Sequence, residues 1–169
     1  LAVDADTGEY RWHYQTTPRD RWDYTATQQI MLADLPLGEG GASRRVVMQA
    51  PKNGFFYVLD AADGELISAT PFTNQNWTTG EFDENGRPVL VDEAVDLALY
   101  AVVPGPTGAH NWHPMAFNPD TGLVYIPVNE IPFFYDKTRN VEDGKSYWNI
   151  GYDAAAGWPV EYPAGTLDA

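Results

Sequence analysis

Two carboxylates in one short loop are the first candidates for chemistry. Asp20 and Asp23 stand on either side of Trp22, shortly after Pro18. Proline fixes its own φ angle, so a loop is predicted to follow the aromatic strand that ends near Tyr14. Loops on a rigid scaffold often carry catalytic groups, and a carboxylate packed against indole is partly desolvated, which a metal ion or another cation offsets. The local pattern by itself favours a simpler interpretation, in which both acids only cap a turn.

Lys52 and Asn111 are further candidates, because each lies in a turn just outside a predicted strand. Lys52 belongs to the turn 50–54, and Asn111 follows the loop 104–108, which is rich in glycine and proline. A single loop lysine is usually solvated, but the loops on one face of a circular β fold converge on its axis, where Lys52 would meet Asp23. The amide of Asn111 both donates and accepts hydrogen bonds, which suits contact with a ligand.

Other motifs do not predict the common active sites. Residues 4–8 superficially match an EF-hand calcium loop, but Gly8 and Gln15 stand where that loop needs oxygen ligands. His110 and His113 are three residues apart without a predicted helix or a third ligand, so a zinc site is not expected. The absence of a Ser-His-Asp pattern, a phosphate-binding glycine loop and a dinucleotide fingerprint disfavours serine hydrolases and nicotinamide enzymes.

The amino-acid composition limits which fold classes and binding partners are expected. Among 169 residues, the 10 Tyr, 7 Phe and 6 Trp favour strands, while 15 Gly and 13 Pro supply turns, so an all-β fold is predicted. The net charge of −14 disfavours nucleic-acid binding. Without cysteine, the sequence contains no disulfide, Cys-ligated zinc site or covalent haem motif, and it contains no membrane span or secretory signal. Because its first residues already form a strand-like pattern, we expect the chain to begin within a larger protein.

Three segments of similar design indicate repeated β-hairpins. Each is an apolar strand, an acidic turn closed by glycine and a second strand, and the turn residues Gly8, Gly64 and Gly122 are 56 and 58 residues apart. Hairpins that recur at long, regular intervals are typical of propeller blades. We expect about two to three blades in residues 1–169, with inserted loops at 73–93 and 136–165.

Taken together, these segments resemble the alcohol dehydrogenases that depend on pyrroloquinoline quinone (PQQ), and in particular their quinohaemoprotein branch. The similarity extends over nearly the whole chain and is carried by residues 12–18, 22–28, 51–60, 103–106, 110–114 and 117–127. The pattern from Ala2 through Gly8 to Trp12 is similar to the tryptophan-docking motif that ties neighbouring blades together in this family.

The resemblance implies part of an eight-bladed propeller that holds PQQ and Ca²⁺ on its axis. By position, Asp23 would be the general base and a metal ligand, Lys52 would approach the quinone oxygens, and Asn111 and Trp112 would contact the cofactor. The reaction implied is oxidation of primary alcohols to aldehydes by hydride transfer to Ca²⁺-bound PQQ, with electrons passed to cytochrome c or a haem domain. Thr25 stands where lanthanide-using relatives carry a second acid, which favours calcium.

The chain departs from the family pattern in a few places. Arg19 stands where relatives usually carry Gly or His, and Ala109 where Gly is commoner. The Glu and Asn that complete the calcium shell, the adjacent-cysteine disulfide and any haem c domain belong to family regions that the chain does not include. We therefore expect the segment by itself not to bind PQQ productively. A periplasmic location follows from the resemblance alone.

Two alternative functions stay open at this point. Quinoprotein-like repeats also occur as scaffolds without a cofactor, and relatives act on sugars or polyols. The joint presence of Asp23, Lys52 and Asn111 in matching loops disfavours the scaffold, which needs only the turn glycines and the docking tryptophan. The sequence does not separate alcohols from sugars.

Overall fold

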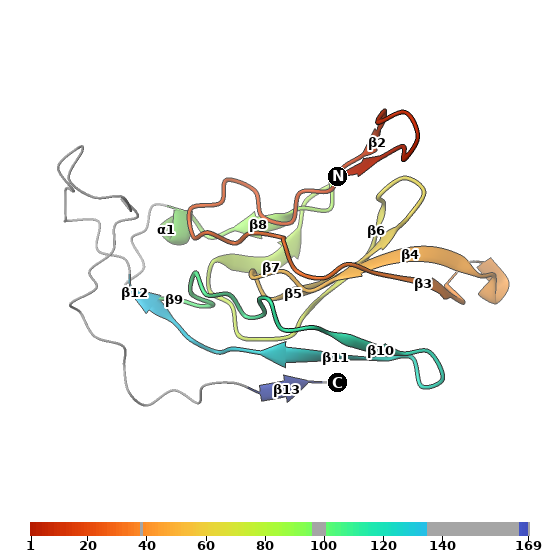
Figure 1. Cartoon of the computed structure of the whole chain (residues 1–169). Coiled ribbons are helices and arrows are strands. Elements are labelled where there is room, and N and C mark those ends of the chain that lie inside the picture. The colour runs from red at the N-terminus through yellow and green to blue at the C-terminus, as the bar shows by residue number, and fades with distance from the viewer. Residues whose placement is uncertain (38, 96–100, 135–165, 169) are drawn as a thin grey trace.

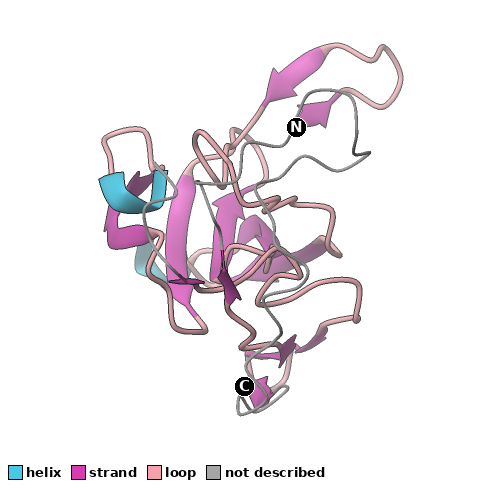
Figure 2. Cartoon of the chain, turned by 90° about the vertical axis from the view of Figure 1, so that its left-hand side faces the viewer, coloured by secondary structure: helices cyan, strands magenta, loops and turns pink. Residues whose placement is uncertain are grey.

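Strands and loops make up nearly all of the structure, a computed structural model that describes residues 1–37, 39–95, 101–134 and 166–168. Within these ranges, helix is confined to the single turn α1 (Asp92–Val95) and the 3₁₀ turn at Glu39–Gly41 (Figure 2). The strands are β1 Ala2–Val3, β2 Tyr10–Trp12, β3 Met31–Leu35, β4 Arg44–Gln49, β5 Phe55–Asp60, β6 Leu66–Pro71, β7 Thr78–Phe82, β8 Pro88–Leu90, β9 Ala101–Val102, β10 Ala116–Asn118, β11 Leu123–Val128, β12 Phe133–Phe134 and β13 Thr166–Asp168. The predicted all-β class is confirmed.

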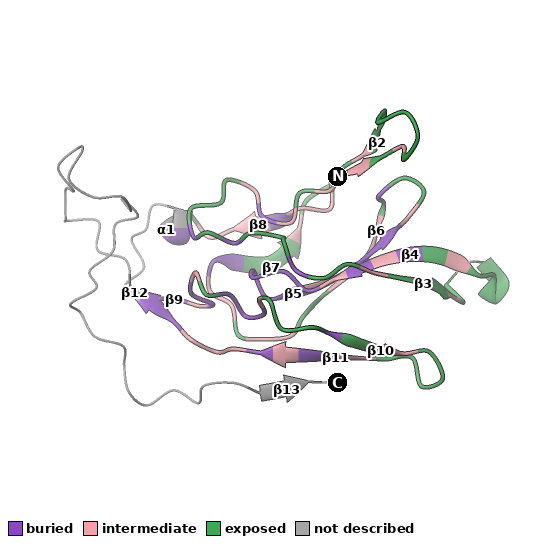
Figure 3. Cartoon of the chain, viewed as in Figure 1, coloured by how far each residue is buried: buried purple, intermediate pink, exposed green. Residues whose placement is uncertain are grey.

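One four-stranded sheet forms a complete blade. Its strands follow the chain in the order β3-β4-β5-β6, and each pairs antiparallel with the next (Figure 1). The register places Met31 opposite Met48 and Phe56 opposite Thr70. Five of the six residues of β5 are buried, whereas every residue of β6 is half-buried or exposed (Figure 3). Burial on both faces therefore makes β5 the strand around which this blade packs.

The three predicted hairpin turns are present, but the third occupies a different place in its sheet. Gly8, Gly64 and Gly122 close the β1–β2, β5–β6 and β10–β11 hairpins with φ angles of 73°, 79° and 72°. In the described residues β6 pairs only with β5, whereas β11 pairs with β10 on one side and β13 on the other. The regular spacing of Gly64 and Gly122 therefore does not mean that the second and third hairpins occupy equivalent positions in their sheets. The strand β13 extends the β10–β11 sheet.

Trp12 joins the first hairpin to the complete blade. Its indole Nε1 donates a hydrogen bond to the carbonyl of Ala61 at 3.1 Å. The ring lies so close to the next hairpin turn that a Cβ added to Gly64 would stand 2.5 Å from the indole Cε3. Only glycine leaves room for this contact, because any side chain would displace the ring. The tryptophan-docking contact expected between blades is thus formed.

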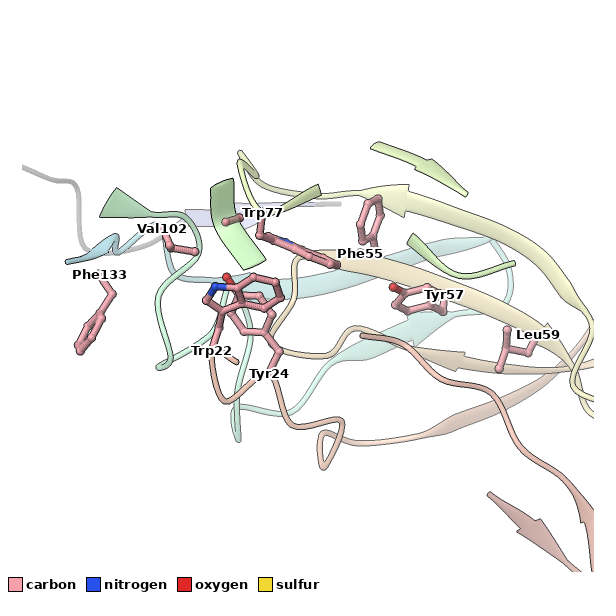
Figure 4. Packing of buried hydrophobic residues seen from close by; sticks show 9 residues of the cluster. Trp22, Tyr24, Phe55, Tyr57, Leu59, Trp77, Val102 and Phe133 are labelled. Atoms are coloured by element: carbon pink, nitrogen blue, oxygen red, sulfur yellow. The ribbon is translucent and has the colours of Figure 1, made fainter. Parts of the chain in front are cut away.

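The largest core cluster is aromatic and lies at one end of the blade. Trp22, Tyr24 and Trp77 are almost completely buried and pack with ring centroids 5.4 to 5.6 Å apart (Figure 4). Phe55 and Tyr57 extend this packing along β5. Such tilted and edge-on ring contacts each contribute about 0.5–1.5 kcal/mol beyond the burial of area. The tightly packed cluster therefore restricts the movement of the loops at this end of the blade.

The structure describes one of the two segments that were predicted to be inserted loops and not the other. Residues 78–90 form the separate hairpin β7–β8 outside the four-stranded sheet, but Trp77 is fully buried in the core. This part of the segment 73–93 is therefore integral to packing, and its status as an insertion stays a prediction. The other segment, 136–165, lies outside the described residues. Besides the complete blade, the described residues form four smaller sheets of two or three strands. Across these ranges no helix has the length and apolar character needed to cross a bilayer.

Candidate active site

Three connections meet at one end of the complete blade. They are the loop from β2 to β3, which carries Asp23, the turn from β4 to β5, which carries Lys52, and the loop from β9 to β10, which carries Asn111 (Figure 1). Because β3 and β4 are antiparallel, the start of β3 and the end of β4 lie at the same end of the sheet. The loop from β9 to β10 belongs to other sheets and reaches this end through the bond from the backbone N–H of Ala109 to the carbonyl of Lys52. Direct hydrogen bonds link all three.

Asp23 and Lys52, the two residues predicted to meet, are in contact. Lys52 Nζ lies 3.0 Å from the carboxylate Oδ2 of Asp23 and 3.0 Å from its main-chain oxygen. The lysine side chain is only 10% exposed, whereas that of Asp23 is 62% exposed. A nearly buried ammonium needs an anionic or carbonyl partner, and Asp23 supplies both. The carboxylate of Asp23 is left largely exposed to solvent.

The environment of Asp23 differs from the one expected. A carboxylate packed against the indole of Trp22 was predicted, but this ring is 1% exposed and lies in the core against Tyr24 and Trp77 (Figure 4). Asp23 follows with a positive φ of 65°. In this conformation its carboxylate Oδ2 accepts a hydrogen bond from Lys52. The nearby cation therefore comes from the protein.

Asp20 takes the turn-capping role that the local pattern favoured for both acids. Its carboxylate Oδ1 accepts a hydrogen bond from the backbone N–H of Trp22 at 2.9 Å. Desolvation raises the pKa of Asp20, and backbone hydrogen bonds from Trp22 and Tyr24 act in the opposite direction. The two acids are thus separated: Asp20 is bound to the backbone of the loop, and Asp23 to Lys52.

Asn53, which the sequence analysis did not single out, fixes the position of the Lys52 turn. The side chain is fully buried, and its Nδ2 donates to the carbonyl of Thr16 at 3.0 Å and to the hydroxyl of Tyr57 at 2.9 Å. Its own main-chain oxygen accepts a hydrogen bond from Trp77 Nε1 at 3.0 Å. The sequence contained a signal for this role, because an Asn next to the lysine in a turn is suited to hydrogen bonds with nearby backbone groups.

His110 ties the loop of Asn111 to the Lys52 turn. Its imidazole is fully buried, with Nδ1 2.6 Å from the carbonyl of Ala50 and Nε2 2.7 Å from that of His113. The backbone N–H of Ala109 adds a bond to the carbonyl of Lys52 at 2.9 Å. Since both ring nitrogens face carbonyl oxygens, His110 holds the two loops together and is not placed to ligate a metal.

Within the described ranges, Asn111 has an unpaired side-chain oxygen, and Trp112 is exposed. Asn111 Nδ2 donates to the carbonyl of Thr107 at 2.8 Å, while its Oδ1 is buried and has no hydrogen-bond partner among the described residues. Trp112 is 89% exposed. Neither side chain forms a hydrogen bond with Asp23 or Lys52 in this part of the chain. The structure thus joins Asp23 and Lys52 directly and links Asn111 to them through the backbone of its loop.

The described residues do not contain a complete metal site. In the described ranges, no group of three or more His, Cys, Asp or Glu side chains comes together in a way that would hold a metal ion. Asp23 offers a carboxylate of which Oδ2 is already bound by Lys52. These residues can therefore supply only part of the coordination shell of a hard cation, which takes six or more oxygen ligands when it is Ca²⁺.

Comparison with known proteins identifies consistent relatives. A family model described as "PQQ: Glucose/ethanol/alcohol dehydrogenase, beta-propeller domain" matches residues 1–74. The quinohemoprotein alcohol dehydrogenase of Comamonas testosteroni is 53% identical over 96% of this chain and 23% of its own length. The 1-butanol dehydrogenase (cytochrome c) of Thauera butanivorans is 44% identical over 100% of this chain and 26% of its own length.

Solved structures of relatives share the fold. The crystal structure of the Comamonas testosteroni enzyme superposes with a TM-score of 0.78 over 98% of this chain and 26% of that one, at 44% identity. A europium-containing methanol dehydrogenase superposes with a TM-score of 0.68 over 79% of this chain and 24% of that one, at 35% identity. The chain thus spans about a quarter of the length of these relatives.

Proposed function

The chain belongs to the PQQ-dependent alcohol dehydrogenases as a segment of their β-propeller domain, and from this premise we propose that it supplies the general base for oxidation of primary alcohols to aldehydes. The base is Asp23. The contact between Asp23 and the nearly buried Lys52 is the observation that supports this role. It leaves an open carboxylate beside a fixed cation at the end of a propeller blade.

The residues around Asp23 fit PQQ, a planar quinone that carries three carboxylates. Lys52 offers a cation, and the unpaired Oδ1 of Asn111 offers an acceptor for a donor of the ligand. The exposed indole of Trp112 offers a flat apolar surface. Lys52, Asn111 and Trp112 are therefore the proposed cofactor-binding residues of this segment.

Asp23 is also the proposed contribution of this segment to a Ca²⁺ site. Carboxylate oxygens suit Ca²⁺, and the remaining ligands would come from outside this segment. Thr25 is exposed and stands two residues after Asp23, so the position offers no second carboxylate. A trivalent lanthanide needs more negative charge in its coordination shell than Ca²⁺ does. The loop therefore favours calcium.

Asp23 and Lys52 have different proposed roles in alcohol oxidation. Asp23 accepts the hydroxyl proton of the alcohol and holds it on a carboxylate oxygen. Lys52 keeps the carboxylate in place through its bond to Oδ2. When bound, Ca²⁺ and PQQ supply a polarised acceptor for the hydride that leaves the alcohol carbon.

The proposed electron acceptor is a cytochrome c or a haem domain, and the proposed location is the periplasm. The names of the Comamonas and Thauera relatives, which refer to a quinohemoprotein and to cytochrome c, support the acceptor. The periplasm is the location that the family resemblance implies. Sugars or polyols are the second candidate substrates, because the description of the matching family model names glucose beside alcohols.

The test uses the full-length protein, in which the flanking sequence completes the propeller. The apoprotein is loaded with PQQ and Ca²⁺, and reduction of an artificial dye is followed with ethanol, 1-butanol, glucose and glycerol. We expect activity with the two primary alcohols that depends on PQQ. Activity with glucose or glycerol alone would support the second candidate, and the absence of both PQQ binding and turnover would support a scaffold.

A further inference from the structure

The loop that carries Asp23 is held in an uncommon backbone conformation. Arg19 and Asp23 have φ angles of 49° and 65°, and in the described part of the chain they are the only residues other than glycine with a positive φ. A side chain is crowded by its own backbone in this region, so the conformation persists only where neighbouring contacts hold it. The contacts around Asp23 therefore decide where its carboxylate points.

Lys52 holds Asp23 from one side only. Its Nζ binds the main-chain oxygen and the carboxylate Oδ2 of Asp23. These bonds fix the carbonyl end of the residue, but they leave the orientation of the preceding peptide free to change. A second restraint is needed to keep the positive φ.

Asp20 supplies this second restraint. Its carboxylate accepts hydrogen bonds from the backbone N–H groups of Trp22, at 2.9 Å, and of Tyr24. These are the residues immediately before and after Asp23, so a single carboxylate spans the peptides on both sides of the base. Although Asp20 is an exposed residue, its carboxyl group faces the loop, and desolvation raises its pKa.

We propose that Asp20 is a positioning residue for Asp23: by bridging the amides of Trp22 and Tyr24, it holds Asp23 in the conformation that meets Lys52. The kinetic part of this inference rests on the proposed function, while the structural part does not. Asp20 acts through its acceptor oxygen, because both of its partners are amide donors. A neutral acceptor of the same shape therefore replaces it.

A matched loop elsewhere in the chain separates positioning from ordinary turn capping. Asp83 Oδ1 accepts hydrogen bonds from the backbone N–H groups of Asn85, at 2.9 Å, and Arg87, at 2.8 Å. This is the same arrangement of one carboxylate and two amides, in the turn between β7 and β8. Removing the Asp83 carboxylate therefore breaks the same kind of hydrogen bonds as removing that of Asp20, but it leaves the loop of Asp23 unchanged.

The experiment compares Asp20→Ala, Asp20→Asn and Asp83→Ala in the full-length protein. For Asp20→Ala we expect kcat to fall by about 10- to 100-fold, with KM changed less than about threefold, because a small misplacement of a catalytic group affects the chemical step most. Asp20→Asn keeps an acceptor oxygen, so its kcat should stay within about threefold of the wild type. The kcat of Asp83→Ala should be unchanged.

A crystal structure of the apo Asp20→Ala protein gives the readout that does not depend on activity. We expect residue 23 to leave the positive φ region and at least one of its bonds to Lys52 to break. Retention of both bonds and of the positive φ would overturn the proposal, even if the wild type oxidised no alcohol. An equal loss of kcat in Asp20→Asn would also overturn it. If Asp20→Ala does not fold, Asp20→Glu, which moves the carboxylate by one methylene, should show the same loss.

Discussion

Lys52 donates from Nζ to Asp23 twice, to the carboxylate Oδ2 and to the main-chain oxygen, each at 3.0 Å. The pair joins a turn inside one blade to the loop that enters it from the preceding hairpin. The lysine side chain is 10% exposed and the aspartate side chain is 62% exposed. The cation of the pair is therefore buried, and the carboxylate is open to solvent. An exposed pair would be weak, but here the buried cation depends on its partner.

Replacing Gly108 tests how strongly the site depends on the position of Lys52. A Cβ on Gly108 would stand 2.4 Å from Lys52 Cγ and 2.8 Å from the carbonyl of His110, so Gly108→Ala must push the lysine away. We expect kcat/KM with primary alcohols to fall at least about tenfold, since the geometry of catalytic groups is restrictive. Steady-state kinetics of the full-length protein measures this effect.

Gly80→Ala is the control for the Gly108 variant. Gly80 has the same φ of 84°, but a Cβ there would meet nothing within 4 Å. Both variants carry the backbone strain of alanine at positive φ, about 1–2 kcal/mol, but only one crowds Lys52. Equal kinetic losses in the two variants would mean that strain, and not displacement of Lys52, is responsible.

The docking of Trp12 on Gly64 should stabilise the propeller. Gly64→Ala would place a Cβ 2.5 Å from the indole, whereas Gly122→Ala, at a similar positive φ, meets nothing within 4 Å. We expect Gly64→Ala to lower the free energy of unfolding by about 1–3 kcal/mol more than Gly122→Ala, which is the usual cost of overpacking. Denaturant unfolding of the two variants measures the difference, and equal losses would contradict a role for the docking contact.

The metal preference of the loop can be tested by removal and return of the ion. After treatment with a chelator, we expect Ca²⁺ to restore alcohol oxidation and La³⁺ to fail, because Thr25 offers no second carboxylate beside Asp23. The Thr25→Asp variant should gain activity with La³⁺. Full recovery of the wild type with La³⁺ alone would contradict the assignment of calcium.

The turn of the first hairpin should respond to acid. The Arg11 guanidinium and nearby hydrogen bonds lower the pKa of Asp4 from 3.8 to about 2. A lowered folded-state pKa gives stability that is present above pH 3.8 and lost as the pH falls towards 2. Arg11→Ala should therefore destabilise the protein at pH 5 and have little effect near pH 2. Thermal melts across this range measure the effect, and in an Asp4→Asn background it should disappear at every pH.

The general architecture could be predicted from sequence because its signals are local. Aromatic strands and acid-glycine turns predicted the β class and all three hairpins, and Trp12 predicted the contact with the next hairpin. The place of the third hairpin could not be predicted, because pairing of β11 with β13 joins residues about forty positions apart. Regular spacing of Gly122 carried no information about that pairing.

The candidate site could be predicted only in part for the same physical reason. Turn chemistry and family resemblance selected Asp23 and Lys52, and the structure brings these two together. The direction of the Trp22 ring depends on Trp77, which packs against it from far along the chain. The buried bonds of Asn53 and His110 likewise connect separate loops, so neither residue was identified as an organiser of the site.

Asp23→Asn in the full-length protein, loaded with PQQ and Ca²⁺, tests the central claim most directly. The amide keeps the shape of the side chain but is a far weaker base, so we predict that kcat for 1-butanol oxidation falls by about 10²- to 10⁴-fold. Bound PQQ, measured by its absorbance after gel filtration, should remain at the wild-type level. A variant that retains PQQ and oxidises 1-butanol at the wild-type rate would contradict the role of Asp23 as the general base.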